Sequence, residues 1–235
     1  MNASHRYAML ISSLPYHGAL FGARRAPLSR IRLRQRQQLL DERDLACLRV
    51  VANLLEWSRQ GMDQRDEEFV ARAKVELPKL ENAFARNLVV RQLEMRTVVA
   101  ALRRRHRGGM PPSGQVRWGY GRWLAHIGRH WLEPHFRLER VYPWLPEART
   151  LLEAGDTLGL ERLLLNAVWE RLERLADGHD FDFEAVLIYS LRWDLIARWT
   201  GCRCDEAAVR FDEMIEEGLK EVVLDDLFNR SASVE

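Results

Sequence analysis

The sequence predicts an all-α protein, a multi-helix bundle with a short extended segment at its N-terminus. Apolar residues recur every three to four positions over several long windows, which is the period of an amphipathic helix. One short apolar run has the character of a strand, so the regular alternation of strands and helices that builds a parallel sheet is missing. We therefore expect helices to form the core.

The candidate extended segment is Tyr7–Leu14, which is apolar and is closed by Pro15. The helices predicted after it cover a window from Leu45 to Leu55 with Gly61 as its stop, then Phe69–Leu77, then Leu80–Arg107 with Gly108 and Gly109 at its end.

A break in the pattern divides the chain into two helical halves, 1–107 and 115–235, joined by a linker at 108–114. The linker is rich in glycine and proline, as in Met110-Pro-Pro-Ser-Gly114. After it, an amphipathic stripe from Leu160 to Leu175 predicts one helix. Phe183–Trp199 predicts another, with Asp180 or Asp182 as its N-cap. The pattern leaves open whether the halves are separate domains or share one core.

Composition excludes several classes of protein. The 235 residues are 47% hydrophobic and include only 14 Gly and 8 Pro, which excludes collagen-like and intrinsically disordered chains. Three cysteines, Cys47, Cys202 and Cys204, are too few for a disulfide framework and favour a reducing compartment. The apolar run Met9–Leu14 is too short for a signal peptide, and no window predicts a membrane-spanning helix. We therefore expect a cytoplasmic protein.

Charge is unevenly distributed behind a net charge of +2. Of the 36 basic residues only three are lysines, and arginines gather in the first half. Carboxylates dominate from Asp205 to Asp226. This polarity favours pairing within the chain or docking against partners of opposite sign. Elsewhere acids and arginines alternate, as in Glu170-Arg171 and Glu173-Arg174, which is typical of a solvated helix face.

The pattern of reactive side chains predicts no enzyme and no cofactor. No nucleotide-binding glycine loop or nucleophile elbow is present. His126, His130 and His135 lie close in sequence, and two of them share a helix face. They leave a metal-dependent enzyme as one alternative and ordinary surface histidines as the other, favoured because Pro134 breaks the helix before His135. Gly119-Tyr-Gly121 is interpreted as a loop.

A second alternative is an arginine-rich nucleic-acid-binding protein. Arg103–Arg107 resembles a phosphate-contacting patch, and Trp118, Tyr120 and Trp123 offer stacking surfaces. A sequence pI near 8.5 is below that of a dedicated nucleic-acid binder, so we rank this alternative lower.

Four segments together resemble a known family. They are Tyr7-Ala-Met-Leu-Ile-Ser-Ser-Leu-Pro15, the arginine-bearing helix Phe84–Arg104, Glu161-Arg162 followed by Trp169 and Leu172, and Phe183-x-x-x-x-x-Tyr189 through Arg198-Trp199. In order and spacing they are similar to an uncharacterised bacterial family that is associated with the V-type (A/V-type) ATPase. That family is distantly similar to the C component of this ATPase, which is called the d component in eukaryotes.

The resemblance implies a non-catalytic structural or adaptor protein, built like the C component, that helps couple or assemble the central stalk and the membrane rotor. Its implied partners are stalk or rotor subunits, with no nucleic acid, and its place is the cytoplasmic face of the inner membrane, reached through protein partners only. The candidate interface residues are Arg86, Arg91, Arg96 and Arg103. The aromatic residues Trp169, Tyr189, Trp193 and Trp199 are expected to anchor the core.

Overall fold

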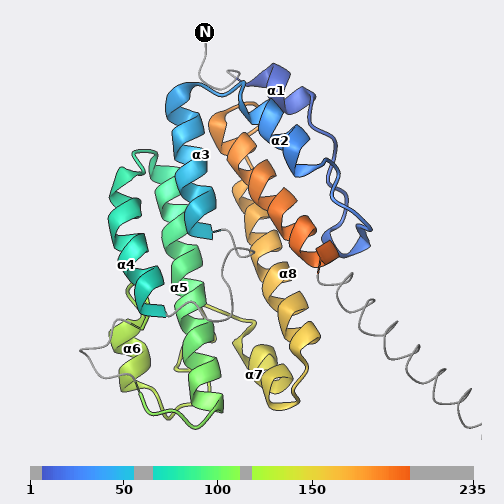
Figure 1. The fold of residues 1–235 in the computed structure, drawn as a ribbon. Helices are drawn as coiled ribbons and strands as arrows, with labels where there is room; N and C mark the ends of the chain where they lie inside the picture. Colours follow the sequence, from blue (N-terminus) through green and yellow to red (C-terminus); the bar gives the residue numbers. More distant parts are fainter. Residues whose placement is uncertain (1–6, 56–65, 112–117, 202–235) are drawn as a thin grey trace, which may run out of the picture.

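The structure, a computed structural model, describes residues 7–55, 66–111 and 118–201, and in these ranges it is all-α with no β-strand. The long helices lie side by side as a bundle, as Figure 1 shows. Helices α1 and α2 lie at one end of the bundle, and α6 and α7 lie at the other. The prediction of an all-α, multi-helix bundle is confirmed.

The helices have the following bounds: α1 Ala8–Ser12, α2 Arg30–Gln37, α3 Glu42–Leu55, α4 Asp66–Glu76, α5 Ala83–His106, α6 Leu124–Arg129, α7 Leu145–Glu153 and α8 Thr157–Leu175. Short 3-10 turns cover Leu20–Gly22 and Leu77–Lys79, and residues 183–201 form a further helix. None of the described helices is both long and apolar enough to cross a bilayer.

The prediction of an extended segment at Tyr7–Leu14 is wrong, because residues Ala8–Ser12 form α1. Its backbone bonds are local, as in the 2.9 Å bond from the Ile11 amide to the Tyr7 carbonyl. A strand needs a neighbouring strand for its hydrogen bonds, and none is present in the described chain. A short helix satisfies the same groups internally while it buries Leu10.

Side-chain caps define where the long helices begin. The carboxylate of Asp182 accepts a 2.9 Å bond from the Ala185 amide, so Asp182 rather than Asp180 caps the helix 183–201. Asn82 and Asp156 cap α5 and α8 in the same way. Gly108, at φ +73°, follows the end of α5, which fits its predicted role as the stop.

Two clusters of buried side chains form the interior. The larger one, nearer α1, joins residues such as Val51 and Val89 to Leu187 and Ile196. The smaller one, nearer α7, joins Val98 to residues of the 127–164 region. Each cluster draws side chains from both sides of residues 108–114.

Several sequence predictions concern residues outside the described ranges. These are the stop at Gly61, the linker residues from Pro112 to Gly114, the pair Cys202 and Cys204, and the acidic stretch from Asp205 to Asp226.

Candidate functional site

The four arginines of the predicted interface, Arg86, Arg91, Arg96 and Arg103, all lie on α5 but do not share one face. At about 100° per residue, Arg96 and Arg103 point within about 20° of each other, whereas Arg86 and Arg91 are about 140° apart. The four arginines therefore lie on different sides of α5 and have different surroundings.

Arg86 serves the local structure. Its Nε donates a 2.9 Å hydrogen bond to the Leu80 carbonyl, and its Nη2 donates to the same oxygen. This carbonyl lies in the turn between the 3-10 segment and α5, so the guanidinium closes that turn. Arg96 borders a small hollow beside Trp118. Arg96 and Arg103 both interact with other residues.

Arg91 is the one of these four that the structure groups with other arginines. It interacts with Arg171 on α8, and Arg174, one turn further along α8, acts on Arg171 as well. Burial, followed by the charge of Arg91, lowers the pKa of the Arg171 guanidinium. Within the described part of the chain none of the three forms an ion pair. We call Arg91, Arg171 and Arg174 the basic seam.

A buried carboxylate lies near the basic seam but is held by a different arginine. Glu94 is only 4% exposed, and its Oε1 lies 3.5 Å from Nε of Arg122 and 3.3 Å from the Arg122 amide. Glu94 also opposes the lowering of the Arg171 pKa, although less than Arg91 and Arg174 promote it. In the described chain Glu94 therefore pairs with Arg122 and forms no ion pair with the three arginines of the seam.

Residues 119–122 form the predicted loop, and α5 fixes its position. The Thr97 hydroxyl accepts a 2.8 Å bond from the Tyr120 amide and donates to the Tyr120 carbonyl at 2.9 Å. Gly121 has φ +102°, and a Cβ there would lie 2.4 Å from Cγ of Glu94. Only glycine fits this contact, so the glycines of the motif serve packing.

The aromatic residues proposed as stacking surfaces are partly buried. Tyr120 packs against the larger core cluster, and Trp118 and Trp123 pack against the smaller one. Trp123 makes edge contacts with His126 and Tyr142, with ring centroids 5.8 and 6.5 Å apart. These rings therefore contribute to the protein's own interior.

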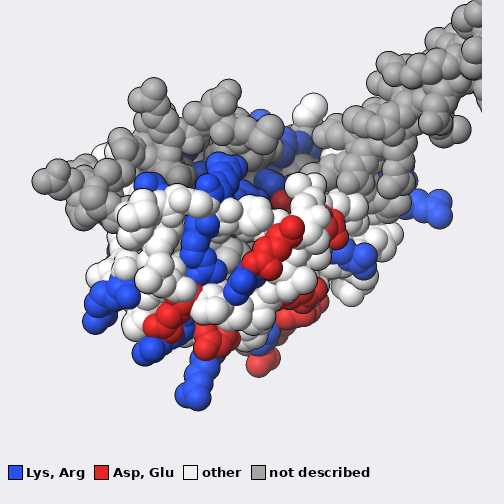
Figure 2. All heavy atoms as spheres, turned by 90° about the horizontal axis from the view of Figure 1, so that it is seen from below, with Lys and Arg blue, Asp and Glu red and all other residues white. Residues whose placement is uncertain are grey.

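The arginine-rich end of α5 is likewise engaged internally. Arg105 donates to the carbonyl of Trp131 at 3.3 Å and to those of Glu133 and Pro134, and its guanidinium lies 4.5 Å from the Phe136 ring centroid. Figure 2, which views the molecule from the α7 end, shows basic and acidic side chains interspersed over that face. On the part of this face that the structure describes, acidic side chains interrupt the basic ones, whereas nucleic-acid binding favours a continuous basic stripe.

The three histidines of the metal alternative are only partly brought together. The His126 and His130 rings lie 4.5 Å apart, but one nitrogen of each is engaged, by the Phe136 carbonyl and the Glu133 carboxylate, both at 2.9 Å. In the described ranges the three do not form a group with ligand atoms in common reach of an ion.

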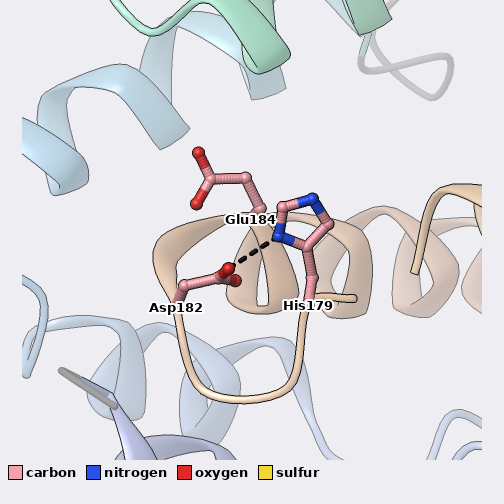
Figure 3. A group of neighbouring side chains, drawn as sticks. All are labelled: His179, Asp182 and Glu184. Atoms are coloured by element: carbon pink, nitrogen blue, oxygen red, sulfur yellow. Dashed lines mark hydrogen bonds and ion pairs between the residues drawn. The ribbon is translucent and has the colours of Figure 1, made fainter. Parts of the chain in front are cut away.

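Another group, His179, Asp182 and Glu184, has ligand atoms within 4.8 Å of one another. Nδ1 of His179 bonds to Asp182 at 2.6 Å, and Figure 3 shows the Glu184 carboxylate pointing away from that bond. Asp182 also caps its helix, and Asn82 donates to Glu184 at 2.9 Å. Each of these side chains therefore already has a structural partner.

Residues that carry the family resemblance meet one another in space although they lie far apart in the sequence. The Tyr189 hydroxyl donates a 2.8 Å bond to the Pro15 carbonyl. The Arg198 guanidinium contacts both carboxylate oxygens of Glu161, with Nη2 3.1 Å from Oε2. The first, third and fourth segments of the resemblance are thus parts of one packed unit.

No protein-family model, curated protein or solved structure matches this chain. The residues themselves and their geometry are therefore the basis for assigning a function.

The sequence interpretation missed Arg171 and Arg174, which it assigned to a solvated face of alternating charges. Their spacing of three residues shows that they share a face of α8. The electrostatic effect of Arg91 on Arg171 depends on how α8 packs beside α5, which the local pattern of the sequence does not show.

Proposed function

We propose that this protein is a non-catalytic structural or adaptor protein that docks on stalk or rotor subunits of a bacterial V-type ATPase and helps to couple or assemble them. The observation that carries the proposal is the meeting of the resemblance motifs. The Tyr189 hydroxyl donates to the Pro15 carbonyl, and Glu161 pairs with Arg198, so these motif residues hold the segment after α1 and helix α8 to the helix 183–201. Motifs of this kind suit a scaffold better than a catalyst.

The basic seam is the docking face in this proposal. Arg91, Arg171 and Arg174 gather like charge on two neighbouring helices, and the described chain supplies no carboxylate to pair with them. A partner that presents Asp or Glu side chains relieves this repulsion on binding, and such complementary charges give specificity and fast association.

Co-purification from membranes tests the proposed function. The tagged full-length chain is expressed in the bacterium that carries its gene, and complexes are captured from detergent-solubilised membranes and identified by mass spectrometry. Stalk and ring subunits of the rotary ATPase are expected in the captured complex and are expected to be absent with an unrelated protein carrying the same tag. A captured complex that holds nucleic acid and no component of the ATPase would overturn the proposal.

A further inference from the structure

A cavity of about 390 Å³ opens between α2, α3 and the 183–201 helix. This volume lies within the range of small-molecule sites. Its floor is apolar and buried, formed by side chains such as Leu33, Leu48 and Val51. Its rim carries Arg34 and Arg49, both exposed. An apolar floor beneath basic groups is the arrangement that holds an amphiphilic anion.

The sequence of α2 builds one wall of this cavity. Arg30, Leu33, Arg34 and Gln37 follow one another at helical spacing, so they share a single face. Gln37 fixes that face against the helix 183–201, because its Nε2 donates a 2.9 Å bond to the Ser190 hydroxyl.

The three arginines that line the cavity are not equivalent. Arg30 is engaged, because it lies 4.0 Å from the Asp194 carboxylate and 5.2 Å from the centroid of the Trp193 ring. In contrast, Arg34 and Arg49 form no ion pair within the described residues. Among the lining residues that the structure describes, three arginines against one aspartate leave an excess of two positive charges.

We propose that this cavity binds a small phosphomonoester with a compact apolar group. A phosphate ester carries nearly two negative charges and three terminal oxygens, which matches the excess charge and two guanidinium groups coming from different helices. A carboxylate carries one charge, which a single guanidinium satisfies. The apolar part of the ester lies on the leucine and valine floor, where its burial adds affinity.

The wall around Trp193 distinguishes this ligand from a nucleotide. Its indole is 3% exposed, its Nε1 bonds to the Leu28 carbonyl at 2.9 Å, and Arg30 lies over its ring. No aromatic face in the described lining is open for a base to stack on.

Calorimetric titration of the full-length protein with phenyl phosphate, inorganic phosphate and benzoate tests the proposal. Phenyl phosphate is expected to bind at least tenfold more tightly than either of the other two. Binding by inorganic phosphate as tight as that of phenyl phosphate would contradict the role of the apolar floor. Binding by benzoate as tight would contradict the choice of phosphate, and no binding by phenyl phosphate would overturn the site itself.

Substitutions locate the binding. Arg34→Gln and Arg49→Gln are each expected to weaken phenyl phosphate binding at least fivefold. Arg32→Gln, an exposed arginine on α2 outside the cavity, is expected to leave it unchanged. These side chains are at the surface, so the variants are expected to fold. Equal binding by all three variants would place the anion elsewhere and reject this cavity.

A floor variant separates the two parts of the ligand. Ala52 lines the cavity, and Ala52→Leu fills part of it. The variant is expected to weaken binding of phenyl phosphate at least fivefold while the affinity for inorganic phosphate stays within twofold. Loss of both to the same degree would contradict the division into an apolar floor and a basic rim.

Discussion

Arg105 and Arg91 lie on the same helix, about four turns apart, and have opposite surroundings. Arg105 donates to the carbonyl oxygens of Trp131, Glu133 and Pro134 and packs on the Phe136 ring. The charge of Arg91 acts on Arg171, as that of Arg174 does, and Arg91 forms no ion pair with a carboxylate in the described chain. Arg105 therefore completes the fold, whereas Arg91 belongs to the docking face that we propose.

The difference follows from the backbone that each arginine meets. The segment after α6 turns irregularly, with positive φ at Phe136 and Arg137. In the described chain the carbonyls of Trp131 and Pro134 have no backbone amide donor, whereas that of Glu133 also accepts a 3.3 Å bond from the Phe136 amide. Arg105 supplies the missing donors. The backbone of α8 near Arg91 is regular helix, and its carbonyls are hydrogen-bonded within the helix. Only side chains could therefore accept hydrogen bonds from Arg91.

The largest expected effect is on stability at the Arg105 end. Arg105→Ala removes the donors to three carbonyls and the contact with Phe136, so we expect a loss of about 3 kcal/mol in the free energy of unfolding. Urea unfolding measures this. Arg107→Ala, an exposed arginine on the same segment, is the control and is expected to change stability by less than about 0.5 kcal/mol. An equal loss of stability in Arg105→Ala and Arg107→Ala would contradict a special structural role for Arg105.

The next largest expected effect is on the pH dependence of stability, and it comes from His17, which lies near Arg192. Burial, and secondly the charge of Arg192, lowers the pKa of His17 from 6.5 to about 4. Nε2 of His17 is buried without a hydrogen-bond partner, and its ring stacks on Tyr189 with centroids 3.8 Å apart. The folded state therefore holds His17 neutral.

His17 is expected to make the folded protein less stable in acid. Because the folded pKa is the lower one, the unfolded chain takes up a proton first, and stability is lost as pH falls from 6.5 toward 4. His17 accounts for about 2 kcal/mol of this loss by pH 5. His17→Phe is expected to lose that part of the acid sensitivity in urea unfolding at pH 7.5 and pH 5, whereas exposed His106→Phe is expected to keep it. An unchanged pH profile in His17→Phe would contradict the assignment.

The pair Glu161 and Arg198 tests the link between two segments of the resemblance. Both side chains are largely buried, with 18% and 27% exposure, and they meet through two oxygens. A double-mutant cycle with Glu161→Ala and Arg198→Ala is expected to give a coupling of about 1 to 2 kcal/mol. A coupling near zero would mean that the contact does not hold the helices together.

The smallest stability effect is expected at the basic seam. Arg91→Gln removes repulsion from Arg171 and breaks no ion pair in the described chain, so stability is expected to stay within about 0.5 kcal/mol or to rise slightly. Thermal unfolding measures this. A clear destabilisation would show that Arg91 has a structural role like that of Arg105.

The parts of the fold that could be predicted from the sequence are those that depend on local patterns. The helical windows, the stop at Gly108 and the cap at Asp182 depend on periodicity and capping, which are local. The prediction for Tyr7–Leu14 is wrong because a short apolar run carries no period, and whether a neighbouring strand exists is not a local property. The docking of its helix depends on distant partners, such as the 2.7 Å bond from the Tyr7 hydroxyl to Asp44.

The candidate sites are less predictable than the fold. The sequence singles out Arg91, but the grouping of Arg91 with Arg171 depends on the packing of α8 beside α5. The cavity likewise depends on three helices meeting, although the spacing of Arg30 and Arg34 already indicates a shared face. Both groupings bring together residues that are far apart in the sequence, and local sequence patterns do not show which distant residues come together.

The most direct measurement is the affinity of the purified V-type ATPase for the immobilised protein, wild type against Arg91→Glu/Arg174→Glu, with Arg140→Glu as an exposed-arginine control outside the seam. The account predicts at least tenfold weaker binding for the seam variant and unchanged binding for the control. Equal affinity of all three forms, or no binding by the wild type, would contradict it.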